Sequence, residues 1–130
     1  MKAKILVIED NEQNLYLTTF LLEKHGFIVL KAMSGPDGIR IAMSDHPDLI
    51  LLDIQLPLMS GYEVAQRIRE LPPVADIPIV AVTSYAMLGD REKVLASGCN
   101  GYIEKPINPD TFVDEISQFI RTAGKDQDVV

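Results

Sequence analysis

Short runs of aliphatic residues recur along the chain at nearly regular intervals and indicate strands. The runs are bounded by polar residues or by Gly and Pro, and each is too short for an independent helix. Continuous apolar runs of this kind are typical of strands buried on both faces of a parallel sheet. Five strands are therefore predicted, at Lys4–Ile8, Ile28–Leu30, Leu49–Leu52, Ile77–Val82 and Gly101–Ile103.

The segments between these runs have the spacing of amphipathic helices. The first begins at Asn11, a favourable N-cap residue, and ends before Gly26, with Leu17, Phe20 and Leu21 on its expected core face. The residues after Ala123 lack a pattern and are predicted to fray. The remaining helices are expected over residues 34–44, from Gly61 to before Pro72, over residues 87–97, and from Phe112 to about Ala123.

Strands that alternate with helices define an α/β fold. Parallel strands need crossover connections, and helices in those connections cover both faces of the sheet. For five strands in a chain of this size, we expect the doubly wound, flavodoxin-like strand order 2-1-3-4-5. No repeat or linker divides the sequence, so residues 1–122 are predicted to form one domain and residues 123–130 a flexible tail.

The composition is that of a globular protein with an acidic surface. The chain has 130 residues, of which 47 % are hydrophobic, and a formal net charge of −7. This excess of acid argues against a binder of nucleic-acid phosphates and favours a protein partner or a cation. Cys99 is the only cysteine, so no intramolecular disulfide is expected. The apolar run Ile5–Ile8 is too short for a signal peptide or a membrane span, and we expect a soluble, cytoplasmic protein.

Polar side chains follow four of the predicted strands. Glu9 and Asp10 follow the first strand, Asp53 the third, Thr83 the fourth and Lys105 the fifth. In a doubly wound sheet, ligands bind beyond the carboxyl ends of the strands, near the point where the strand order reverses. Each residue alone has a structural explanation, because acids favour helix N-termini, aspartates form turns and lysines are usually solvated. Their common place at one sheet edge predicts a functional site instead.

Three carboxylates, a hydroxyl and a lysine fit the chemistry of phosphoryl transfer. Crowded carboxylates need a cation, and oxygen ligands without His or Cys favour Mg²⁺ over Zn²⁺. A lysine adds positive charge for a phosphoryl group, and a carboxylate such as Asp53 can accept that group covalently. The patterns GxxxxGK(S/T) and GxGxxG are absent from the sequence, so no nucleotide donor site is expected. His25 and His46 fall near helix ends, where structural roles are expected.

Four motifs resemble the receiver domain of bacterial two-component response regulators. The motifs are IEDN at 8–11, LLDIQLPLMSGYE at 51–63, AVTSYA at 81–86 and GYIEKP at 101–106. Their order and spacing agree with that family over residues 2 to about 122. The resemblance implies a CheY-like fold. It also implies a phosphoacceptor that promotes its own phosphorylation and dephosphorylation, rather than a turnover enzyme.

The resemblance implies a role for each residue at the sheet edge. Asp53 matches the phosphoacceptor, and Lys105 matches the lysine that pairs with the phosphoryl group. Asp10 and Asp53 match the side-chain ligands of Mg²⁺, or of Mn²⁺ in its place, and the main-chain carbonyl of Gln55 matches a third ligand. Glu9 stands where the family often has an aspartate and would act on the metal through a water molecule.

Further matched positions imply a conformational switch. Thr83 matches the hydroxyl that moves toward the phosphoryl group, and Tyr102 matches the aromatic residue that turns into the vacated space. The Lys105–Pro106 peptide bond is expected to be cis. Gln55 and Tyr85 occupy the variable positions beside the site and are expected to tune the lifetime of the acyl phosphate. The expected output is a changed surface on the fourth helix, the fifth strand and the fifth helix.

The chain as a whole resembles the stand-alone receivers of the DivK type. The implied partners are a sensor histidine kinase or a histidine phosphotransfer protein, and a downstream target protein, without direct contact to nucleic acid or membrane. Two alternatives within the fold are a receiver domain excised from a longer response regulator or hybrid kinase, and an interaction module that is not phosphorylated. A phosphatase of the haloacid dehalogenase class is the third alternative. That class has a second aspartate two residues after its nucleophile, where this chain has Gln55.

Overall fold

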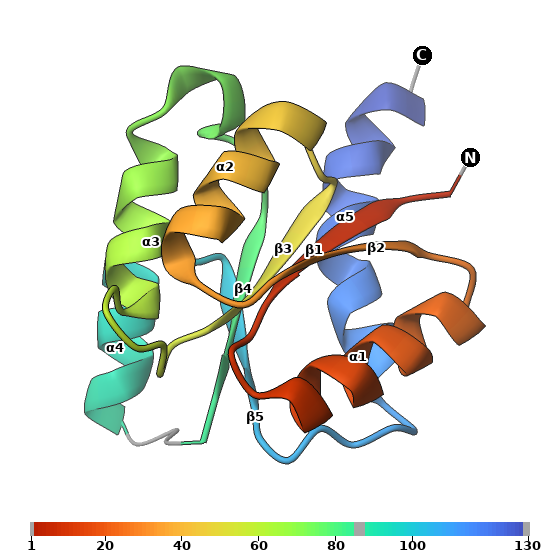
Figure 1. The fold of residues 1–130 in the computed structure, drawn as a ribbon. Helices are drawn as coiled ribbons and strands as arrows, with labels where there is room; N and C mark the ends of the chain where they lie inside the picture. The colour runs from red at the N-terminus through yellow and green to blue at the C-terminus, as the bar shows by residue number, and fades with distance from the viewer. Residues whose placement is uncertain (1, 85–87, 129–130) are drawn as a thin grey trace.

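A five-stranded parallel sheet forms the centre of the computed structural model, which describes residues 2–84 and 88–128. Its strands are β1 (Lys4–Ile8), β2 (Ile28–Ala32), β3 (Leu49–Asp53), β4 (Ile79–Thr83) and β5 (Gly101–Glu104). They lie side by side in the order β2-β1-β3-β4-β5, and their carboxyl ends share the lower edge of the sheet in Figure 1. The predicted fold class and strand order are confirmed.

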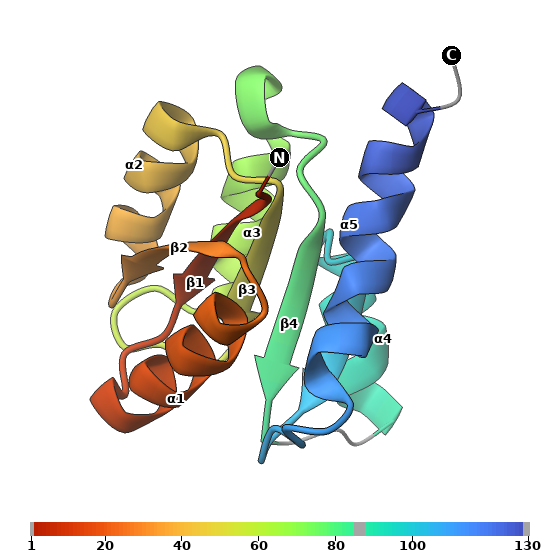
Figure 2. The ribbon, with the colours of Figure 1, turned by 90° about the vertical axis from the view of Figure 1, so that its right-hand side faces the viewer.

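Helices cover both faces of the sheet, as Figures 1 and 2 show from two directions. Helices α1 (Glu12–Lys24) and α5 (Phe112–Asp128) pack on one face. Helices α2 (Gly35–Asp45), α3 (Gly61–Arg69) and α4 (Leu88–Ala96) pack on the other. A short 3-10 helix, η1 (Pro72–Val74), follows α3 where the sequence indicated only a helix stop. No helix in the described parts of the chain is long and apolar enough to cross a membrane.

The core consists of two apolar layers, one on each side of the sheet. Successive strand residues point to opposite faces, so Ile50 and Leu52 join the layer under α2, α3 and α4, while Leu51 joins the layer under α1 and α5. Every residue of β3 and of β4 is buried, as the continuous aliphatic runs predicted. Burying one large aliphatic side chain stabilises the folded state by roughly 1.5–3 kcal/mol. The central strands are therefore rigid, and they hold the residues at their carboxyl ends in fixed positions.

The two ends of α1 agree with the predicted capping residues. The Asn11 side chain accepts a hydrogen bond from the backbone N–H of Asn14 at 2.9 Å, and Ser34 caps α2 in the same way. Gly26, with φ of +90°, follows the C-cap of α1 and adopts the left-handed backbone that glycine permits. Helix α5 extends to Asp128, beyond the end near residue 123 that the apolar pattern indicated. The domain limit at 122 and the flexible tail stay predictions.

The predicted core face of α1 is only partly right: Leu21 is buried as predicted, but the other two residues are not. Leu17 and Phe20 are 43 % and 52 % exposed, and the neighbouring Tyr16 is 73 % exposed. The buried stripe of α1 instead has the i, i+3, i+4, i+7 spacing and contains two threonines. Threonine is counted as polar, so a pattern of apolar residues alone does not reveal this stripe. The residues with this spacing are Leu15, Thr18, Thr19 and Leu22, and Leu21 is buried beside them. Helix α1 therefore exposes an apolar strip on the molecular surface.

Arg69, in the last turn of α3, joins three separate segments at the edge of the sheet opposite the polar strand ends. Its guanidinium donates hydrogen bonds to the carbonyl oxygens of Ala75, Ile77 and Gly98 at 2.7–2.9 Å. It also donates to Oδ1 of Asn100 at 2.8 Å, and that oxygen accepts a second bond from the N–H of Ile79. The sequence pattern did not indicate this role, because the acceptors are carbonyls that only the folded chain brings together.

We expect Arg69→Ala to lower the free energy of unfolding by about 2–4 kcal/mol, because several partly buried acceptors lose their donors at once. The measurement is urea denaturation followed by circular dichroism. Arg67→Ala is the matched control: Arg67 is an exposed arginine on the same helix, and its loss should change stability by less than about 0.5 kcal/mol. Equal effects of the two substitutions would contradict the structural role of Arg69.

Candidate functional site

The polar residues that follow the strands lie at one edge of the sheet. Asp53 and Thr83 are the last residues of β3 and β4, and they are 4 % exposed each. Glu9 and Lys105 directly follow β1 and β5. Because β1, β3, β4 and β5 are neighbours in the sheet, these residues are brought together although the sequence separates Glu9 from Lys105 by 96 positions.

The carboxylate of Asp53 is held from several sides. The backbone N–H of Gln55 donates a hydrogen bond to Oδ1 of Asp53 at 3.0 Å, and the ammonium group of Lys105 lies 3.4 Å from Oδ2. The first residue of α3, Gly61, packs against the backbone at the end of β3. A Cβ on Gly61 would lie 2.7 Å from the carbonyl oxygen of Asp53 and 2.6 Å from Cα of Ile54. Only glycine fits there, so the start of α3 fixes the position of Asp53.

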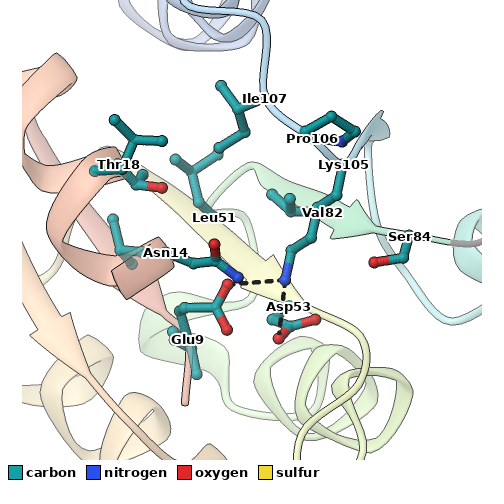
Figure 3. Close-up of a pocket in the computed structure, with 13 residues that line it drawn as sticks. Glu9, Asn14, Thr18, Leu51, Asp53, Val82, Ser84, Lys105, Pro106 and Ile107 are labelled. Atoms are coloured by element: carbon teal, nitrogen blue, oxygen red, sulfur yellow. Dashed lines mark hydrogen bonds and ion pairs between the residues drawn. The ribbon is translucent and has the colours of Figure 1, made fainter. Parts of the chain in front are cut away.

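Lys105 reaches the site from the loop after β5 (Figure 3). Its Nζ donates a hydrogen bond to Oε1 of Glu9 at 2.9 Å, shorter than its contact with Asp53. Its backbone N–H donates to the carbonyl of Thr83 at 2.8 Å, which ties the loop to the end of β4. The Lys105–Pro106 peptide bond is cis, as predicted.

Glu9, Asp10 and Asp53 form an acidic cluster that can hold a metal ion. One carboxylate oxygen from each residue lies within 4.8 Å of the others, and Asp10 is the most exposed of the three. Oε2 of Glu9 also accepts a hydrogen bond from the N–H of Asn11 at 3.2 Å. Three carboxylates with no His or Cys in the cluster make an oxygen-only donor set, which suits a hard divalent cation such as Mg²⁺. The residues present therefore fit the predicted ion.

The protonation of the cluster reflects its burial. Burial of Glu9, together with its hydrogen bond to Asp53 and the negative charge there, raises the pKa of Glu9 to about 7, although Lys105 acts in the opposite direction. Burial alone would lower the pKa of Lys105, but the contacts with Glu9 and Asp53 outweigh it and leave that pKa raised. Lys105 is thus firmly cationic, and its single charge does not compensate the acidic cluster.

Tyr102 lies on β5 and contacts helix α4. Its hydroxyl accepts a hydrogen bond from Nε of Arg91 at 2.8 Å, and the Arg91 guanidinium carbon lies 5.1 Å from the centre of the tyrosine ring. Sequence reasoning selected Tyr102 but missed Arg91, because nothing in the local pattern of α4 marks this arginine as a partner of β5. Tyr85, the other flanking position named from the sequence, lies outside the described residues.

The fold and this acidic site define the class of protein. The sequence matches the response regulator receiver domain family over residues 5–117, and the chain belongs to that family. Such a receiver is a phosphoacceptor signalling protein of two-component systems, not a turnover enzyme, and receiver domains pair with histidine kinases. The family assignment excludes the haloacid dehalogenase alternative.

Individual relatives agree with this class. The polar-differentiation response regulator DivK of Brucella ovis is 39 % identical over 123 residues, which are 95 % of this chain and 100 % of that protein. DivK of Brucella anthropi is 37 % identical over the same shares of the two chains. The predicted resemblance to DivK-type receivers is confirmed.

A solved structure connects the acidic cluster with a metal. The receiver domain of a sensor histidine kinase from Pseudomonas aeruginosa is 32 % identical, with a TM-score of 0.85 over 92 % of this chain and 98 % of that chain. That structure holds a magnesium ion in its active site cleft. A CheY-like receiver domain protein from Methanospirillum hungatei is 29 % identical, with a TM-score of 0.88 over 97 % and 99 % of the two chains. A receiver-domain relative thus binds Mg²⁺ in its active site, and the acidic triad is present here.

The raised pKa of Glu9 predicts a pH dependence of the metal-free protein. Folded Glu9 holds its proton up to about pH 7, whereas the unfolded residue loses it near pH 4.5. The folded state therefore binds more protons between these values, and the stability that Glu9 contributes is present below pH 4.5 and lost as the pH rises through 7. The loss is on the order of 3 kcal/mol.

Urea denaturation across this pH range, with chelator present, compares the wild type with Glu9→Gln. The wild type should lose stability relative to the variant as the pH rises, because glutamine does not ionise. Parallel pH profiles for the two proteins would contradict the prediction. Saturating Mg²⁺ should reduce the loss, because the ion stabilises the ionised carboxylates.

Proposed function

We propose that this chain is a phosphorylation-dependent signalling switch that accepts a phosphoryl group from a partner phosphohistidine onto Asp53. The observation that carries the proposal is the placement of Asp53, a carboxylate buried at the end of a rigid strand with Lys105 3.4 Å away and the Glu9–Asp10 pair beside it. The carboxylate is fixed, nucleophilic and next to positive charge, as a covalent phosphoryl acceptor requires.

The proposed metal site uses the same cluster. Asp10 and Asp53 supply side-chain ligands to Mg²⁺ or Mn²⁺, Gln55 supplies its main-chain carbonyl, and Glu9 acts through a water molecule. The ion, when bound, supplies positive charge that neutralises the oxygens of the transferred phosphoryl group. The raised pKa of Glu9 supports this role, because the cluster lacks sufficient positive charge of its own.

The transfer needs little covalent chemistry from the protein. An oxygen of Asp53 forms a bond to phosphorus as the bond between phosphorus and the histidine nitrogen breaks, and the electron pair of that bond stays on the nitrogen. Lys105 pairs with the phosphoryl oxygens, and the Thr83 hydroxyl donates to one of them after moving inward. Gln55, and Tyr85 by its position in the family pattern, are proposed to set the lifetime of the acyl phosphate.

The proposed phosphodonor is a protein, either a sensor histidine kinase or a histidine phosphotransfer protein. The exposed apolar residues Tyr16, Leu17 and Phe20 on α1 support a protein donor, because contiguous apolar side chains at a surface favour a packed interface. The net charge of −7 disfavours nucleic acid as a direct target. A cytoplasmic protein with a stand-alone, DivK-like role is the function that we favour, and a receiver domain of a longer protein would carry the same site.

The first experiment is incubation of the protein with acetyl phosphate and Mg²⁺, followed by intact-mass measurement. We expect one phosphoryl group on the wild type, none on Asp53→Asn, and none on the wild type after chelation of the metal. Asp110→Asn is the matched control, since Asp110 is an exposed aspartate outside the acidic cluster and its variant should be labelled normally. Equal labelling of the wild type and Asp53→Asn would contradict the proposal that Asp53 is the phosphoacceptor. An unlabelled wild type would favour the interaction module that is not phosphorylated.

Phosphorylation is proposed to reach the surface through Thr83 and Tyr102. The added charge of about −1.5 to −2 draws the buried Thr83 hydroxyl inward, and the Tyr102 ring turns into the space that it leaves. Tyr102 must then give up its hydrogen bond to Arg91, which changes the surface formed by α4, β5 and α5. The downstream target protein is proposed to bind this surface.

Nuclear magnetic resonance of the aromatic side chains can follow this switch with a beryllium fluoride complex as a stable phosphoryl mimic. We expect the ring signals of Tyr102 to shift when the mimic binds, and the shift to disappear in Thr83→Ala, because the hydroxyl couples the two sites. Tyr16, which is 73 % exposed, is the internal control and should not respond. Unchanged Tyr102 signals in the wild type with the mimic bound would refute the coupling.

A further inference from the structure

A pocket of about 450 Å³ opens beside Asp53, between α1 and the loop after β5. At one end it contains the carboxylates of Glu9 and Asp53 and the ammonium group of Lys105. The rest of the pocket has mainly apolar walls. The apolar wall residues include Val7, Leu17, Leu51, Val82, Pro106 and Ile107. The pocket is thus much larger than a phosphoryl group and has room for part of the molecule that delivers it.

Asn14 is a polar residue of this pocket to which the mechanism above gives no role. Its side chain projects from the first turn of α1, and Figure 3 shows the amide directed toward Lys105 and Glu9, with Leu51 and Ile107 to one side. Asn14 is exposed, and within residues 2–84 and 88–128 its side-chain amide makes no hydrogen bond to another protein atom; only its backbone N–H is engaged, by Asn11. Both carboxylate oxygens of Glu9 already accept hydrogen bonds from other donors: Oε1 from Lys105 and Oε2 from the N–H of Asn11. Glu9 therefore does not depend on Asn14 for a donor.

The chemistry of this pocket fits the imidazole ring of the phosphodonor. A flat ring suits apolar walls, and its second nitrogen needs a hydrogen-bond partner when water is displaced. We infer that Asn14 is a positioning residue for this ring, with its amide oxygen accepting a hydrogen bond from the N–H of the ring nitrogen that does not carry phosphorus. The inference rests on the proposed function and assigns a binding subsite to the leaving group of the same reaction.

The hydrogen bond has a defined consequence for the transfer. The phosphorylated ring is reactive when its second nitrogen is protonated, because the P–N electron pair can then return to a ring that leaves as neutral imidazole. The proton stays on the nitrogen that faces Asn14, and the phosphoryl group passes to an oxygen of Asp53. Asn14 therefore holds the ring in its reactive protonation state and orients the P–N bond toward Asp53.

The test compares two small phosphodonors on the intact chain with Mg²⁺. Phosphoimidazole carries the ring, and acetyl phosphate does not. Initial rates of Asp53 labelling are measured by intact mass over a range of donor concentrations for the wild type, Asn14→Ala and Asn14→Leu. Leucine fills a similar volume without an amide. Gln13→Ala, an exposed neighbour on α1 that does not line the pocket, is the matched control.

We expect Asn14→Ala and Asn14→Leu to react roughly tenfold more slowly with phosphoimidazole and at an unchanged rate with acetyl phosphate. Gln13→Ala should behave as the wild type with both donors. An unchanged rate of Asn14→Ala with phosphoimidazole overturns the inference. An equal loss with both donors also overturns it, because Asn14 would then act on Asp53 or on the fold. A wild type that neither donor labels would overturn the proposed function itself, and the inference with it.

Discussion

An ammonium group held between two buried carboxylates is the interaction on which the rest of this structure depends. Lys105 lies 2.9 Å from Glu9 and 3.4 Å from Asp53, and its side chain is only 17 % exposed. Buried charges are tolerated only when they are paired, because desolvation costs several kcal/mol for each ion. The pairing here is incomplete, since one lysine is paired with two buried acids, a third acid lies in the same cluster, and the pKa of Glu9 rises to about 7. The site therefore carries more negative than positive charge, and a bound divalent cation would neutralise this excess.

The fold is organised to hold these charges in place. Asp53 ends a strand whose residues are all buried, and Gly61 allows α3 to begin in contact with the backbone that carries it. Lys105 is anchored through its N–H to the carbonyl of Thr83, at the end of the adjacent strand. A parallel sheet thus holds side chains that are far apart in the sequence within a few ångströms of one another, in a rigid arrangement. Rigid placement matters for phosphoryl transfer, which depends on position and charge more than on covalent assistance.

Two surfaces extend from the site and connect it with other molecules. On one side, the pocket beside Asp53 continues to the exposed apolar strip of α1, with Leu17 belonging to both. On the other side, Tyr102 contacts Arg91 and so couples β5 to α4. The first surface suits the delivery of a phosphoryl group, and the second suits a change that a target protein can detect. Both surfaces depend on the same strand ends, so a charge added at Asp53 lies close to each of them.

The sequence by itself determined the strand order, the caps of the first helix and the set of residues at the sheet edge. Those features follow from local periodicity, from capping chemistry and from the rule that parallel strands place their carboxyl ends together. It did not indicate the exposed face of α1, because the threonines of its buried stripe look polar in a one-dimensional pattern.

Only the tertiary structure decided which partners the polar groups have. Lys105 is closer to Glu9 than to Asp53. Arg69 donates hydrogen bonds to four acceptors. Asn14 points into the pocket, and its side chain has no hydrogen-bond partner among the residues described. These contacts join segments that are far apart in the chain. Their distances depend on how the helices pack on the sheet, and no spacing in the sequence encodes that packing.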